Sequence, residues 1–129
     1  MSVGIVGGTT SASAQLNFNA QTGTTYTLVA ADAENKLVTT SNASAVTVTV
    51  PPSVFTAGQQ INVASIGVGL TSFAAGAGVT ITSTGATAAA PILRARYSAG
   101  TVICTASNTF LIVGDLSCCL LYTSDAADE

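Results

Sequence analysis

Strict alternation of valine and threonine marks residues 45–50, which read AVTVTV. Successive side chains of a β-strand point to opposite faces, so this pattern predicts a strand with its valines on a dry face and its threonines on a wet one. No long stretch of the chain repeats apolar residues at the spacing of a helix face. We therefore expect an all-β protein.

Similar runs, separated by turn residues, recur along the chain at a spacing of about 8–12 residues. Pro51-Pro52 should end the valine–threonine strand, because proline cannot donate to a ladder, and Ser107-Asn108 predicts a tight hairpin. About nine short strands of this kind predict an antiparallel β-sandwich, jelly-roll-like or barrel-like. Nine strands are expected near Thr25–Leu28, Lys36–Thr40, Ala45–Val50, Gln60–Ser65, Leu70–Ala75, Val79–Ser83, Ile92–Tyr97, Val102–Ala106 and Thr109–Val113, and a further short strand could precede them at Leu16–Asn19.

The chain divides into three parts by composition. Residues 1–20 are rich in Gly, Ser and Thr and are expected to form a linker or docking segment. Residues 21–117 carry the strand pattern and should form the β-sandwich domain. The last part, residues 118–129, contains the string CLLYTSDAADE, which resembles the translation of a transposase-type sequencing adapter. We therefore expect this tail to carry no function.

The residue types exclude most kinds of chemistry. Charged residues make up 7% of the chain and histidine is absent, whereas a typical soluble domain has about 25% charged residues. A chain without histidine has no His-based nucleophile system, imidazole base or His-ligated metal. Three Lys and Arg residues are too few for a nucleic-acid surface, and no apolar stretch is long enough for a spanning helix. We expect no enzyme activity, cofactor, metal, nucleic acid or membrane insertion.

The candidate contact residues are Arg94, Arg96, Tyr97 and Asp115. Two residues apart on a predicted strand, Arg94 and Arg96 should share a face, where they could bind an anionic sugar or phosphate. The favoured interpretation is a solvated or inter-subunit face on which Asp115 is the partner, since Arg forms bidentate pairs with carboxylates. Tyr97, like Tyr26, could stack on a sugar, but anchoring in a core or interface is favoured.

Two other sites in the sequence carry reactive side chains. Asp32, Glu34 and Lys36 could contact a cation or glycan, but a solvated turn with an Asx hydrogen bond is the favoured interpretation. Cys104, in an apolar run, is expected to be a small buried side chain, because no histidine is present to activate it.

Several sequence segments, in the order in which they occur along the chain, resemble those of a known family. Residues 22–52 read TGTTYTLVAADAENKLVTTSNASAVTVTVPP, and GAGVTITS (76–83), Tyr97 and SNTFLIVGDL (107–116) follow. This order resembles a domain of bacteriophage virion appendages, including tail fibres, head fibres and capsid decoration proteins, over about residues 16–117. Phe110 departs from the pattern, which has Trp there.

The resemblance implies a structural, self-assembling and non-catalytic module located in the virion and assembled in the host cytoplasm. It also implies a homo-oligomer, a trimer, that contacts other virion proteins. The alternative is a carbohydrate-binding module that recognises a glycan on the host surface.

Overall fold

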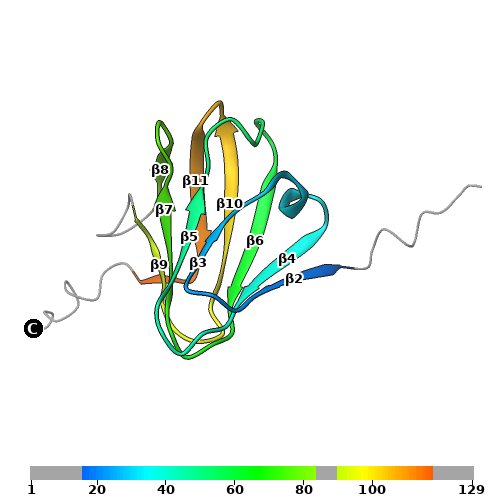
Figure 1. The fold of residues 1–129 in the computed structure, drawn as a ribbon. Coiled ribbons are helices and arrows are strands. Elements are labelled where there is room, and N and C mark those ends of the chain that lie inside the picture. Colours follow the sequence, from blue (N-terminus) through cyan, green and yellow to red (C-terminus); the bar gives the residue numbers. More distant parts are fainter. Residues whose placement is uncertain (1–15, 84–89, 118–129) are drawn as a thin grey trace, which may run out of the picture.

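The computed structural model describes residues 16–83 and 90–117, which form eleven strands in two sheets and one short 3-10 helix, η2 (Ala30–Ala33) (Figure 1). The six-stranded sheet has the order β2-β4-β6-β10-β11-β8, and the five-stranded sheet has the order β12-β9-β7-β5-β3. The strands are β2 (Asn17–Gln21), β3 (Thr25–Thr27), β4 (Lys36–Thr40), β5 (Val46–Val50), β6 (Gln60–Ser65), β7 (Thr71–Ala75), β8 (Thr80–Thr82), β9 (Ile92–Leu93), β10 (Ala99–Ala106), β11 (Thr109–Gly114) and β12 (Leu116–Ser117).

The first six strands coil between the two sheets. The chain passes from β2 to β3, from β4 to β5 and from β6 to β7, changing sheet at each step. Because each new strand lies parallel to the equivalent strand of the turn before it, Val38 pairs with Val63 in one sheet and Val48 with Phe73 in the other. The result is a β-solenoid of about three turns.

The expected all-β class is confirmed, but the predicted antiparallel β-sandwich or barrel of about nine strands is wrong. Pairing is antiparallel only in the later part of the chain, where β10 lies between β6 and β11 and β9 joins β7 to β12. Alternation of side chains is the same in parallel and antiparallel strands, so the sequence pattern could not distinguish the two arrangements.

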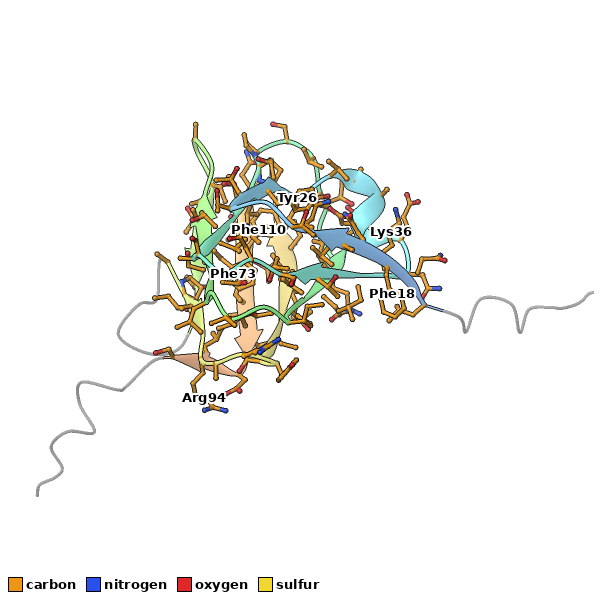
Figure 2. All side chains as sticks on the ribbon, turned by 60° about the horizontal axis from the view of Figure 1, so that its bottom comes forward. Phe18, Tyr26, Lys36, Phe73, Arg94 and Phe110 are labelled. Atoms are coloured by element: carbon orange, nitrogen blue, oxygen red, sulfur yellow. The ribbon has the colours of Figure 1, made fainter. Side chains whose placement is uncertain are left out.

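The core fills the space between the two sheets. The valines of β5 are at most 1% exposed, and Phe73 and Phe110 are each 1% exposed, in the interior of the view in Figure 2. The rings of Phe55 and Phe110 meet edge to face at 6.1 Å between centroids, a favoured aromatic geometry. Burial of each such side chain contributes about 1.5–3 kcal/mol.

The turns at one end of the solenoid stack on one another. The amide of Ser41 donates to Gln21 O at 3.0 Å, and that of Gly69 donates to Asn42 O at 2.8 Å. Inside this end the hydroxyl oxygens of Thr40 and Thr71, both buried, lie 2.6 Å apart. Backbone and side-chain bonds therefore hold consecutive turns in register.

Several predicted elements are confirmed and others are displaced. The strands at Lys36–Thr40 and Gln60–Ser65 have the predicted bounds, and the hairpin at Ser107-Asn108 joins β10 to β11. Strand β2 lies mostly within the segment expected to be a linker, whose residues 1–15 fall outside the described residues. The tail 118–129 and most of the Ala-rich loop before β9 also fall outside them.

Candidate contact site at the Arg94–Ser98 loop

The candidate residues lie in the loop between β9 and β10. The predicted strand Ile92–Tyr97 is wrong beyond Leu93, because the chain turns there instead of extending. Arg94 and Arg96 consequently do not share a strand face. Figure 2 shows Arg94 pointing outward at the lower end of the molecule, away from Phe18 at its right.

The predicted pair of Arg94 and Asp115 is present. Nε of Arg94 donates to Oδ1 of Asp115 at 2.8 Å and Nη2 donates to Oδ2 at 3.0 Å, which is the bidentate geometry expected of these residue types. Hydrogen bonds from Arg94 and then from Ser98 lower the pKa of Asp115, and the hydrogen bond to Asp115 raises the pKa of Arg94. Both side chains are exposed, at 62% and 44%, so water and salt screen their attraction.

The Asp115 side chain is bonded to Ser98 as well as to Arg94, and so it contacts both ends of the loop. The buried Ser98 hydroxyl donates to Oδ2 of Asp115 at 2.7 Å and accepts a bond from the amide of Ala95 at 3.1 Å. The amide of Arg94 also donates to the Asp115 carbonyl at 2.9 Å. The carboxylate thus fixes both ends of the loop, and we assign it a positioning role.

Arg96 and Tyr97 form the exposed tip of the loop. The guanidinium carbon of Arg96 lies 4.9 Å from the centroid of the Tyr97 ring, within cation–π range. Nε of Arg96 donates to Ile66 O at 3.1 Å, which ties the side chain to the third turn of the solenoid. Among residues 16–83 and 90–117, the only salt bridge is that of Arg94, so Arg96 has no carboxylate partner there.

Tyr97 is both strained and exposed. Its φ of 71° lies in the left-handed region, which is unusual for a bulky residue. Its amide donates to Ser65 O at 2.6 Å, which holds the backbone in place. The side chain is 71% exposed, so the prediction that Tyr97 anchors in a core is wrong for the single chain. A role at an interface or in stacking on a ligand stays a prediction.

The Asp32 cluster differs from its prediction. Asp32 is 1% exposed rather than solvated. It accepts bonds from Nδ2 of Asn19 at 2.8 Å, the hydroxyl of Tyr26 at 2.7 Å and the amide of Val29 at 2.9 Å. The last bond comes from the N-cap of η2, three residues earlier, and not from an amide two residues on as in the predicted Asx turn, while Glu34 is exposed. The cluster therefore closes the first solenoid turn with a satisfied polar network.

Tyr26 titrates abnormally in this network. Burial raises its pKa to about 12, and the hydrogen bond to Asp32 adds to the shift. A phenol in this state holds its proton and donates a hydrogen bond at neutral pH. The geometry fits a structural bond better than acid–base chemistry.

The potential metal ligands and the thiol have the following places in the part of the chain that the structure describes. No group of three or more His, Cys, Asp or Glu side chains that could hold a metal ion occurs among the described residues. Cys104 is buried, as predicted, and its thiol donates to the Ala106 carbonyl at 3.2 Å. Among the described residues, no helix is long and apolar enough to cross a membrane.

Sequence reasoning missed Ser98 and Ile66, which complete the loop's contacts. Ser98 follows a stretch predicted to be a strand, and Ile66 acts through its carbonyl, which carries no sequence signal. No family model, no curated protein and no solved structure matches this chain.

Proposed function

We propose that the chain is a structural, non-catalytic module of a bacteriophage virion, in a fibre, spike or decoration protein. The resemblance of residues 22–52 and 107–116 to virion appendage domains is the basis for this assignment. The observation that favours it is the stacked coil itself, in which parallel strands pair turn upon turn.

The function in this proposal is mechanical. Each solenoid turn adds its inward side chains to the space between the two sheets, so stacked turns give a continuous core. The outward positions of β3, β5 and β7 are Thr25, Thr27, Thr47, Thr49 and Ser72, next to Ala74. The hydroxyls of Ser and Thr stay neutral over the ordinary pH range, so such a surface suits a scaffold that meets changing conditions.

The gene neighbourhood tests this proposal most directly. Capsid, portal or tail genes beside the coding sequence would support it, whereas neighbours that encode a metabolic pathway would contradict it. The solution mass of the purified chain is the second test, since a self-assembling module should form a homo-oligomer, with a trimer expected from the resemblance.

Carbohydrate binding is the second candidate function, and the Arg96–Tyr97 tip favours it. An exposed ring offers an apolar face for a sugar, and the guanidinium beside it has further donors for hydroxyl or carboxylate groups. Binding of the chain to a glycan array, lost in Tyr97→Ala and retained in Tyr26→Phe, would support this function. Absence of binding to any glycan would remove it.

A further inference from the structure

The Arg94–Ser98 loop carries two guanidinium groups, and only one of them is neutralised. Nε and Nη2 of Arg94 both donate to Asp115, so this pair has no net charge. Arg96 donates through Nε, and its acceptor is the uncharged carbonyl of Ile66. Among the residues that the structure describes, no carboxylate pairs with Arg96. The tip of the loop therefore keeps one positive charge, together with the Nη donors through which arginine binds an anion.

The backbone of Tyr97 is strained for a ring that the chain itself does not bury. A φ of 71° is adopted most readily by glycine, and the other non-glycine residues with positive φ in the described ranges are the small polar Asn35, Ser53 and Asn108. Tyr97 is 71% exposed, so burial within the chain does not offset the strain. Residues held in such conformations cluster at ligand-binding sites. A large exposed ring on this backbone therefore points to a contact outside the single chain.

Both side chains of the tip are held in place by the rest of the fold. The amide of Tyr97 donates to Ser65 O at 2.6 Å, and Nε of Arg96 donates to Ile66 O at 3.1 Å. The guanidinium carbon lies 4.9 Å from the centroid of the tyrosine ring. This loop runs along the lower end of the molecule in Figure 1, where it is drawn in yellow. Groups that are already ordered lose less conformational freedom on binding, so the tip presents a cation and a ring in a preset arrangement.

The main chain around the tip is occupied by bonds within the chain. The amides of Ile66 and Gly67 both donate to Thr40 O, at 2.8 and 3.1 Å, and that of Tyr97 donates to Ser65 O. Extended peptides are commonly bound through main-chain hydrogen bonds to an open strand edge, and these amides do not offer such bonds. Recognition at the tip therefore depends on the two side chains. They fit a compact ligand that has an apolar face and an anionic group close together.

We propose that the Arg96–Tyr97 tip binds a sugar that carries a carboxylate. The carboxylate accepts hydrogen bonds from the Nη groups of Arg96, which match it in geometry and charge. The apolar face of the sugar ring packs on the exposed ring of Tyr97. This inference rests on the carbohydrate binding given above as the second candidate function, and it adds the class of saccharide.

The test is binding of the full chain to acidic oligosaccharides, each compared with its neutral methyl ester. The probes are oligogalacturonate, alginate oligosaccharide, hyaluronan oligosaccharide and sialyllactose. At least one acidic probe should bind, and its methyl ester should bind about tenfold more weakly or less, because the charged hydrogen bonds are lost.

Matched variants assign the binding to the tip. Arg96→Gln should weaken it about tenfold or more, whereas Lys36→Gln removes the same charge at the far end of β4 and should leave it unchanged. Tyr97→Gly removes the ring and suits the positive φ, so it should fold as the wild type does and yet lose binding. Tyr97→Phe keeps the ring and should keep binding. Circular dichroism and thermal unfolding check that each variant is folded.

The outcomes separate this inference from the functions proposed above. Equal binding of acids and methyl esters, or binding unchanged in Arg96→Gln, overturns the acidic sugar and leaves carbohydrate binding intact. Binding to no saccharide, acidic or neutral, removes both. Binding to polyglutamate and to no saccharide makes the partner an acidic peptide and also overturns the inference. The structural module is tested separately, by gene neighbourhood and solution mass.

Discussion

The amide of Gly69 donates to the carbonyl of Asn42 at 2.8 Å, which seats the third turn of the solenoid directly on the second. A Cβ at Gly69 would collide with the backbone of Ser44, and no flexible side chain is available there to move aside. The close stacking of the two turns therefore requires a glycine at this position.

We predict that Gly69→Ala destabilises the fold by at least about 1–3 kcal/mol, because it overpacks a backbone contact. Chemical denaturation measures the loss. The matched control is Gly23→Ala in the first turn, whose Cβ would come no nearer than 3.8 Å to another heavy atom. Equal stability of the two variants would show that the turns do not stack as described.

The carboxylate of Asp32 accepts three hydrogen bonds in a buried position. Asp32→Ala leaves these donors without their acceptor, and we expect a loss of about 2–3 kcal/mol in the free energy of unfolding. Glu34→Ala, two residues away and exposed, should change stability by no more than about 0.5 kcal/mol. Urea titration of both variants checks this, and a similar loss in both would contradict the buried network.

Tyr26 should make the fold sensitive to alkali. Its folded pKa of about 12 exceeds its ordinary value of 10.0, so the folded state binds the proton more tightly. The corresponding stability is fully present below pH 10 and is lost as pH rises toward 12. Thermal unfolding across this range should show the loss in the wild type and a smaller one in Tyr26→Phe. An identical pH dependence of the two proteins would refute the assignment.

Asp115 should make the fold sensitive to acid. Its folded pKa lies below the ordinary value of 3.8, so its contribution is present above that pH and is lost as pH falls through the folded pKa. Asp115→Asn removes this contribution, and its unfolding midpoint should depend less on pH between about pH 5 and pH 2 than that of the wild type. Glu34→Gln serves as the control and should keep the wild-type acid dependence.

Asp115 also positions the tip of the loop. When its bonds to Arg94 and Ser98 are lost, the strained backbone at Tyr97 has less to hold it. We expect faster amide exchange at Tyr97 and Ser98 in Asp115→Ala than in the wild type, with β4 and β5 unchanged. If amide exchange at the loop is unchanged, Asp115 has no positioning role and only forms a surface ion pair with Arg94.

Residue chemistry predicted some details better than strand pattern did. The pairing of Arg94 with Asp115 followed from the bidentate fit of their side chains, and it holds although the strand predicted for Arg94 does not extend that far. The burial of Asp32 could not be predicted, because a charged residue in a short polar segment is usually solvated. Its partners come from β2 and β3, and only the coil brings these strands to η2.

The sequence by itself determined that this protein is made mainly of strands, and for the valine–threonine strand it determined which side chains are buried. Val46, Val48 and Val50 are inward as their alternation with threonine requires, because a pleated backbone turns every second residue to the same face. Only the tertiary structure decided which strand lies beside which, and in which direction. Parallel and antiparallel neighbours accept the same alternation, so the choice depends on contacts between distant residues, such as Gly69 with Asn42 and Thr40 with Thr71.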